Sequence, residues 1–291
     1  MNRASLLLQS LILVLVVVCL LEVERVRKSA EAVLLVAGSP SPRAPAPPAR
    51  DPDSLLEELR GACDRFLSNP QDPVEQRLAE RQMDASVAAL KALGGAGFGP
   101  LAAALDSPAP AAFRQRVLET MAGIDPGRTI EPALRIFRSP GDPILRMAAA
   151  AVAMRLDPDR TLPELVSLLR KESERSFPPL GEAVSLAAEK GGPDVERALL
   201  DLAEHPDRGR SSSYRAIEAL GVLKAPAAVA SLRRIVLSEP QDGVLRRKGI
   251  QALVQIQGKE GCPFLEECAR GERDEIFRLF LENVIKETCR K

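Results

Sequence analysis

The feature that most constrains this chain is a leucine that recurs at nearly constant spacing from residue 101 onward. Its successive members lie 33, 31, 34, 33 and 33 residues apart, and a second apolar position recurs at 28, 32, 34, 33 and 33. Such periods are typical of repeat proteins, in which each unit buries its apolar face against its neighbours. The first series is Leu101, Leu134, Leu165, Leu199, Leu232 and Leu265, and the second is Leu93, Met121, Ala153, Ala187, Leu220 and Leu253.

Each repeat is predicted to be a pair of helices. Apolar residues make up 45% of the 291-residue chain, yet aromatic residues make up only 3%, which disfavours the strands of a sandwich or barrel. Within residues 213–236 the apolar residues follow helical spacing on both sides of Pro226. Breaks of the same kind occur at 125–127, 157–158 and 191–193, and we predict that these breaks separate the two helices of successive hairpins.

A second pattern marks the start of the predicted first helices. An Asp precedes an Arg by four residues at Asp142/Arg146, Asp242/Arg246 and Asp274/Arg278. An Asp at the N-cap accepts hydrogen bonds from unpaired backbone amides, and Pro143 suits the first helical position. We predict that the Asp residues are N-caps and that each Arg is structural. Arg114 occupies the same place without the Asp, and Leu180 and Ser213 depart from the pattern.

The Asp-to-Arg run and the period near 33 resemble the D-x-x-[VIL]-R-x-x-A pattern of HEAT repeats, and in particular the short bacterial repeats of phycobilisome lyases. The resemblance covers residues 83–287. It implies an all-α, armadillo-like α-solenoid of about six hairpins, with the second helices lining the concave side. It implies no active site, because the fold serves many functions.

The N-terminus carries one long apolar segment. Residues 4–21 contain no charge and would span about 27 Å as a helix, close to the thickness of a bilayer core. A cleaved signal peptide is the alternative, but the nearest small-residue site, Ala30 and Ala32, lies beyond several charges. We therefore predict a single-pass membrane anchor. Counting Lys and Arg favours a cytoplasmic C-terminal side, whereas the short N-terminal tail and the stalk described next favour the extracytoplasmic side, which we adopt.

These features divide the chain into four parts. Residues 1–36 are assigned to the membrane anchor and a juxtamembrane helix, and residues 37–52 to a linker whose proline density excludes helix and sheet. Residues 53–82 have a helical pattern outside the repeat register and are expected to cap the solenoid. Residues 83–291 are assigned to the HEAT-like repeats.

Residues able to perform catalysis or bind a metal are few. The single histidine, His205, lies near a helix C-terminus, where the helix dipole accounts for it. Cys63, Cys262, Cys268 and Cys289 lack metal-ligand spacing, although Cys262 or Cys268 could pair with Cys289 in an exported domain. The glycine-rich segment 94–100 and the serines of 209–213 are interpreted as loops. We therefore predict no enzyme activity, no cofactor and no metal site.

The remaining candidate surface is basic. Six residues on the predicted second helices are candidates for binding an acidic or mixed-charge protein segment: Arg135, Arg138, Arg170, Lys171, Arg233 and Arg234. Nucleic acid is disfavoured because 40 basic residues balance 40 acidic ones. The sequence thus favours a membrane-tethered, non-enzymatic scaffold that binds a protein along the concave face. The alternative is an accessory, lyase-like protein that acts on a cofactor-bearing or modified partner.

Overall fold

The computed structural model describes residues 51–238 and 243–290, and this part of the chain is helical with no strand, as predicted. Two helices, α2 (Pro52–Ser68) and α3 (Pro73–Ala92), form an N-terminal hairpin. The helices that follow are α4 (Gly95–Asp106), α5 (Ala111–Ile124), α6 (Pro126–Arg138), α7 (Pro143–Leu156), α8 (Pro158–Lys171), α9 (Leu180–Ala188), α10 (Pro193–Glu204), α11 (Arg210–Val222), α12 (Val229–Ser238), α13 (Gly243–Gln257), α14 (Cys262–Gly271) and α15 (Glu275–Thr288).

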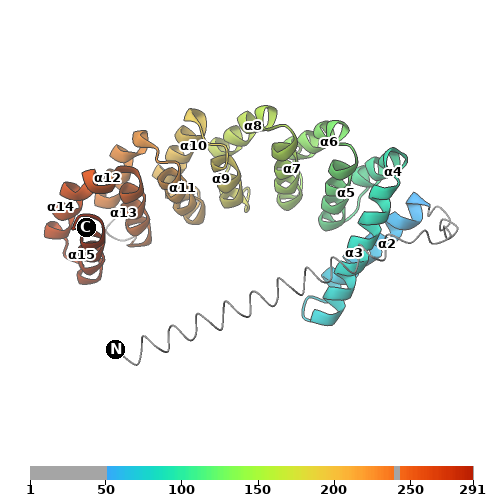
Figure 1. Ribbon diagram of the computed structural model, residues 1–291, viewed down its shortest axis with the longest axis horizontal. Coiled ribbons are helices and arrows are strands. Elements are labelled where there is room, and N and C mark those ends of the chain that lie inside the picture. The colour runs from blue at the N-terminus through green and yellow to red at the C-terminus, as the bar shows by residue number, and fades with distance from the viewer. Residues whose placement is uncertain (1–50, 239–242, 291) are drawn as a thin grey trace, which may run out of the picture. The chain divides into compact units, whose positions relative to one another are not determined.

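From α4 onward the helices alternate between two rows, which can be followed in Figure 1. We call the even-numbered helices α4 to α14 the outer row and the odd-numbered helices α5 to α15 the inner row. Inner helices pack directly on one another at α5–α7, α9–α11 and α11–α13, whereas among the outer helices only α8 and α10 do so extensively. Because the inner helices are closer together, the array from α4 to α15 bends toward the inner row, and the outer row follows its convex side.

Both repeat series are core positions, as predicted. The leucine series lies on the outer helices and is at most 1% exposed at all six positions. Met121, Ala153, Ala187, Leu220 and Leu253 of the second series are equally buried on the inner helices. Leu93 is the exception, since it ends α3 and is half-buried. The interior between the two rows is thus one continuous apolar core.

The pairing of helices into hairpins differs from the sequence prediction. The helices α6, α10 and α12 each pack more extensively on the helix that follows than on the one that precedes, and α8 is the exception. The leucine-bearing outer helices are therefore the first helices of the hairpins. The prediction took the sharp Asp-Pro breaks as hairpin turns, but α5 and α6, which the single residue Asp125 joins, pack on each other less extensively than α6 and α7 do. The longer link 139–142 lets α6 and α7 lie alongside each other.

The close approach of the inner helices depends on small residues. A Cβ placed on Gly221 of α11 would lie 2.9 Å from the Ala252 Cα of α13, closer than real carbon atoms approach. Ala149, Ala150 and Ala153 give α7 a similarly small buried face. Alanine and glycine at these positions therefore set the spacing of the inner row.

The predicted Asp caps are confirmed where the structure describes them. Asp142 accepts hydrogen bonds from the Ile144 and Leu145 amides at 2.9 Å each, and Asp274 accepts one from the Phe277 amide at 2.8 Å. Asp242 lies outside the described residues. Asp125 and Asp157, at the sharp breaks, cap α6 and α8 in the same way.

Arg146 and Arg246 are structural, as predicted, whereas Arg278, the third Arg of the pattern, lies 3.9 Å from Glu282 of its own helix. The Nε atom of Arg146 donates to the Phe137 carbonyl at 3.1 Å, and that of Arg246 donates to the Val236 carbonyl at 3.0 Å. Arg114 bonds the Leu105 carbonyl at 2.8 Å. In each case the guanidinium satisfies a carbonyl in the last turn of the outer helix of its own hairpin. These residues therefore join the two helices of a hairpin.

The two departures from the Arg pattern retain this hydrogen bond by other means. The Ser213 hydroxyl lies 2.8 Å from the Leu202 carbonyl at the end of α10. Where Leu180 replaces the Arg, Arg208 reaches back to the end of α8 and donates to the Leu169 and Glu172 carbonyls. These two hairpins therefore also have a side-chain hydrogen bond to the end of the outer helix, although a different residue makes it.

Two segments predicted to be loops are helical. Residues 95–100 form the start of α4, because Phe98 is buried and carries the guanidinium of Arg128 at 4.0 Å over its ring. Residues 210–213 begin α11, and Ser212 and Ser213 are fully buried. In both segments burial outweighs the weak helix propensity of glycine and serine.

The expected boundary between cap and repeats, at residues 82 and 83, falls inside α3. The helices α2 and α3 pack as one hairpin, and Cys63 Sγ of α2 lies 3.4 Å from Met83 Sδ of α3. The helix continues through residues 82 and 83 without a helix-breaking residue. The next break in the backbone is at Gly94, where φ is 56°. The six hairpins therefore begin with α4/α5 and end with α14/α15.

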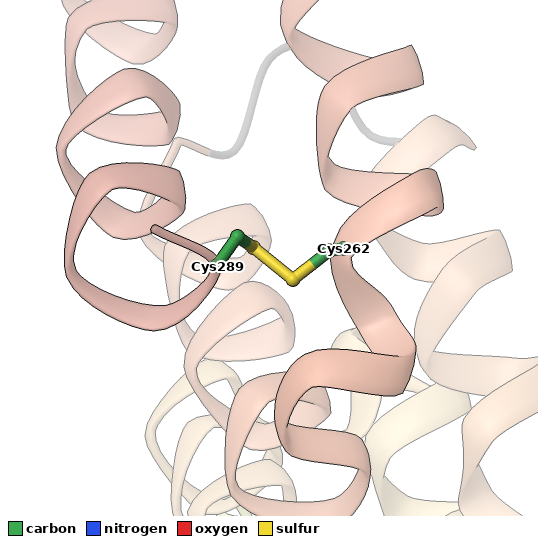
Figure 2. Close-up of a disulfide and its surroundings, with 2 residues drawn as sticks. All are labelled: Cys262 and Cys289. Carbon is green, nitrogen blue, oxygen red and sulfur yellow. A yellow bond between two sulfur atoms is a disulfide. The ribbon is translucent and has the colours of Figure 1, made fainter. Parts of the chain in front are cut away.

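A disulfide closes the last hairpin. Cys262, at the start of α14, is bonded to Cys289, just after α15, with their Cα atoms 5.9 Å apart (Figure 2). This is one of the two pairings that the sequence left open. The bond ties the outer helix to the inner helix at the end of the array.

Candidate functional site

The six predicted basic residues lie on outer helices, which follow the convex side of the array rather than the expected concave side. Three of them already have partners in the adjacent repeat. Arg135 bonds Asp106 at 2.7 Å, Arg138 bonds both oxygens of Glu164 at 2.9 and 3.0 Å, and Arg234 bonds Glu204 at 2.7 Å. The structure therefore does not bring the six together as one unpaired basic stripe.

The other three basic residues differ from these. Arg170 and Lys171 are exposed at the end of α8, and no ion pair joins them to the residues that the structure describes. Arg233 is half-buried, with its guanidinium 4.9 Å from the Phe264 ring and one hydrogen bond of 3.2 Å to the Gln257 amide oxygen. Its Nε atom is buried without a hydrogen-bond partner in the described part of the chain. Arg233 is thus a cation that no described carboxylate neutralises.

Grooves lie between three pairs of successive outer helices in the described chain. The groove between α6 and α8, which we call the α6/α8 groove, has a volume of about 350 Å³. It is lined by Arg138, Arg146, Glu164, Lys171 and Glu172, among others. The Arg138–Glu164 ion pair crosses it from one helix to the next, so that charged side chains occupy its mouth.

The equivalent groove between α12 and α14, the α12/α14 groove, is larger, at about 590 Å³. Seven of its lining residues match seven of the α6/α8 groove at a constant offset of 100 positions: Leu237, Arg246, Phe264, Glu267, Cys268, Gly271 and Glu272 correspond to Phe137, Arg146, Glu164, Ser167, Leu168, Lys171 and Glu172. Only the Arg and the Glu of the pairs 146/246 and 172/272 are the same in both grooves, and the replacements in the larger groove include a Phe for Glu164, a Glu for Ser167 and a Gly for Lys171.

The floor of the α12/α14 groove is a buried ion pair. Arg246 bonds Glu272, with only 11% and 10% of the two side chains exposed, and its guanidinium lies 3.8 Å from the Phe277 ring. Burial alone would raise the pKa of the Glu272 carboxyl, but hydrogen bonds from the Asp274 amide and from Arg246 outweigh it and lower the pKa. The Glu272 carboxylate is therefore stabilised in its charged form beside Arg246.

The thiol of Cys268 in the same groove is unreactive. Burial, reinforced by the charge of Glu267, raises the pKa of Cys268 to about 11. A thiol with such a pKa remains protonated near neutral pH and is a poor nucleophile. Its contribution to the groove is apolar surface.

A third groove lies between α10 and α12 and also measures about 590 Å³. Glu204, His205, Ser231 and Arg234 line it, together with Leu237, which also lines the α12/α14 groove. Leu237 is 65% exposed and lies at the boundary of both grooves. The two grooves therefore adjoin at the end of α12.

The residues considered as catalytic or metal-binding candidates make structural contacts. His205 ends α10, and its Nδ1 atom lies 2.6 Å from the Asp201 carbonyl oxygen. Within the described residues no three His, Cys, Asp or Glu side chains gather as metal ligands. Likewise no helix of residues 51–238 and 243–290 is long and apolar enough to cross a bilayer, and the predicted anchor, residues 4–21, lies outside them.

Phe264, Leu237 and Glu272 were not singled out from the sequence. The 100-residue offset that relates the two grooves is present in the sequence, but its meaning depends on which helices face each other. Comparison of the chain with protein-family models, with curated proteins and with solved structures found no match, so the site rests on its own geometry.

Proposed function

We propose that this protein is a non-enzymatic scaffold of HEAT-like repeats that binds a protein partner along its outer row. The observation that carries the proposal is the series of grooves between successive outer helices, each containing at least one arginine. A repeat array of this kind presents an extended surface, which is suited to a polypeptide rather than to a small substrate.

The basic residues support a modified form of the surface suggested by the sequence. Arg135, Arg138 and Arg234 are engaged in ion pairs between repeats, which removes them as free anion-binding groups. Arg170, Lys171 and Arg233 are not so engaged within the described chain. A partner with acidic or mixed charge would therefore contact the array at α8 and at α12.

We further propose that residues 4–21 anchor the protein in a membrane and that the repeats lie on the extracytoplasmic side. The uncharged length of residues 4–21 supports the anchor. The disulfide Cys262–Cys289 supports an oxidising compartment, because such bonds persist outside the reducing cytosol. Tethering raises the effective concentration of the scaffold toward other membrane proteins without any additional contact.

Site-specific photo-crosslinking in the full-length chain tests the scaffold proposal. A photoreactive amino acid at Arg170, exposed on α8, should crosslink to a discrete partner in membranes, whereas the same group at Arg155, exposed on the inner helix α7, should not. Equal crosslinking from both positions, or none from either, would contradict the outer row as the binding surface. N-terminal sequencing of the membrane-bound protein tests the anchor, and a mature end near residue 31 would exclude it.

A further inference from the structure

The α12/α14 groove differs from its counterpart in the same molecule in a way that points to a ligand. We infer that it is the principal contact site of the array and that it binds a protein segment in which an acidic residue adjoins a bulky apolar one. This inference rests on the proposed scaffold function, and it adds the location of the contact and the chemistry of the partner.

The apolar part of the site is formed by three side chains. Leu237 of α12 is 65% exposed, and Phe264 and Cys268 of α14 are half-buried in the facing wall. An apolar partner residue placed between Leu237 and Phe264 would remove apolar surface from water on both sides and would therefore be stabilised by burial.

The charged part of the site is Arg233. Its guanidinium stacks on Phe264 at 4.9 Å and hydrogen-bonds the neutral Gln257, and no ion pair joins it to a described carboxylate, Glu267 of the same groove included. Arg246, by contrast, is occupied by Glu272. A carboxylate next to the apolar residue of the partner would bind Arg233 in a partly desolvated position, where charge-assisted hydrogen bonds are strongest.

In the α6/α8 groove an ion pair occupies the place that is open in the α12/α14 groove. There Glu164 takes the place of Phe264 and pairs with Arg138, and Lys171 takes the place of Gly271. In the α12/α14 groove position 264 is Phe, and neither Glu267 nor Glu272, which also line this groove, forms an ion pair with Arg233. A partner carboxylate would supply that ion pair.

The size of the site favours an extended segment. The α12/α14 groove and the α10/α12 groove each have a volume of about 590 Å³ and share Leu237 as a common wall. A segment lying across the end of α12 would therefore reach from Arg233 to the second groove, where Arg234 is already paired with Glu204. Charge complementarity thus places the acidic residue of the partner at Arg233.

Fluorescence anisotropy with short labelled peptides tests the inference on the full-length chain. The probe is Ser-Glu-Phe-Glu-Ser-amide with a fluorophore on its N-terminal amine, and two matched peptides with the same fluorophore replace either both Glu by Gln or Phe by Ala. The Glu-Phe-Glu peptide should bind saturably below about 1 mM, and each matched peptide should bind at least about 10-fold more weakly, since each lacks one half of the recognition.

Variants assign the binding to the groove. Arg233→Gln should weaken binding of the Glu-Phe-Glu peptide about 10-fold, because it removes the charge and keeps the hydrogen-bonding amide. Phe264→Glu should place a carboxylate beside Arg233, as Glu164 lies beside Arg138, and should abolish binding of the peptide. The control is Arg138→Gln, which removes a guanidinium from the equivalent groove and should leave the affinity within about twofold. Circular dichroism of each variant verifies the fold.

The outcomes are distinct. Equal binding of the Glu and Gln peptides, equal loss in Arg233→Gln and Arg138→Gln, or no saturable binding would each overturn the assignment of the groove. If the photo-crosslink at position 170 also persists in Phe264→Glu, the scaffold function stands and the partner contacts another part of the outer row. If the crosslink is absent in the unsubstituted chain as well, the scaffold function itself fails.

Discussion

Different interactions hold neighbouring helices together in the inner row and in the outer row. Inner helices approach closely through small residues, as where Gly221 meets Ala252, and their first turns hold the preceding outer helix through Arg146 or Arg246. Outer helices are farther apart and are linked mainly by exposed ion pairs such as Arg135–Asp106. The inner row therefore contributes close packing, and the more widely spaced outer row leaves grooves between its helices.

This difference separates stability from recognition. Exposed ion pairs contribute little to folding, so outer-row residues can change with small cost to the array. Glu164 and Phe264, at equivalent positions of two repeats, illustrate such a change. Inner-row residues have less freedom, because a larger side chain there meets a neighbouring helix. The following predictions, from the largest expected effect to the smallest, test this division.

Arg246→Met should have the largest effect. It leaves the buried carboxylate of Glu272 without its cation and removes the bond to the Val236 carbonyl, which should cost about 3 kcal/mol of unfolding free energy. Denaturant unfolding measures this. Arg146→Met is the matched comparison and should cost less, since Arg146 lies 4.0 Å from Glu172 in a more exposed pair.

The same ion pair predicts a dependence of stability on pH. Because the pKa of Glu272 is lowered from its ordinary value of 4.5, its contribution is complete above that pH and is lost as the pH falls below it. The difference in stability between the unsubstituted protein and Arg246→Met should therefore shrink below pH 4.5. A constant difference down to pH 3 would show that the pair is not the cause.

Cys289→Ser should be next in size. The disulfide links residues 27 positions apart, and its loss should cost about 2 to 4 kcal/mol. Thermal unfolding of the oxidised protein, with and without a reductant, measures the effect. Cys268→Ser is the control, since Cys268 is a free thiol whose replacement breaks no bond. Equal losses in both variants would indicate that the cross-link does not form.

Gly221→Leu should disrupt the stacking of the inner row. The added side chain meets the backbone of α13 at Ala252, so overpacking of about 1 to 3 kcal/mol is expected. Gly99→Ala on the outer helix α4 is the control, because a Cβ there meets nothing within 4 Å, and it should be neutral or slightly stabilising. Similar destabilisation in both would remove the distinction between the rows.

Asp142→Ala should cost about 0.5 to 2 kcal/mol through the loss of an N-cap. Hydrogen exchange should show loss of protection in residues 142–156 and in the adjacent hairpins, and little change at α14 and α15, because repeats couple mainly to their neighbours. Asp142→Asn retains a capping side chain and should behave almost as the unsubstituted protein does. Unchanged protection at 142–156 in the Ala variant would rule out the cap.

Arg135→Gln should have the smallest effect. Its ion pair with Asp106 is about half exposed on both sides, and such pairs contribute little, so the melting temperature should change by about 2 °C or less. A larger loss would mean that the outer row stabilises the array as the inner row does.

Local chemistry in the sequence was sufficient to predict the helices, their caps and their core positions. The leucine series is buried because helical periodicity fixes which face of each helix is apolar, and Asp142 caps because its side chain reaches the amides two and three residues on. Interactions within one or two turns depend on few residues. They can therefore be predicted without knowing how distant segments are placed.

The tertiary structure alone decided which helices pair, which side of the array is convex and which grooves remain open. The placement of the basic residues on the concave side was wrong because the bend depends on distances between helices of different repeats. The loop predicted at 95–100 became helix because Phe98 is buried by the fold. Phe264 is a candidate contact because α14 packs beside α12 and places it in a groove. Such a groove is lined by residues about 30 positions apart in the sequence. Their proximity depends on how the repeats pack and not on local sequence.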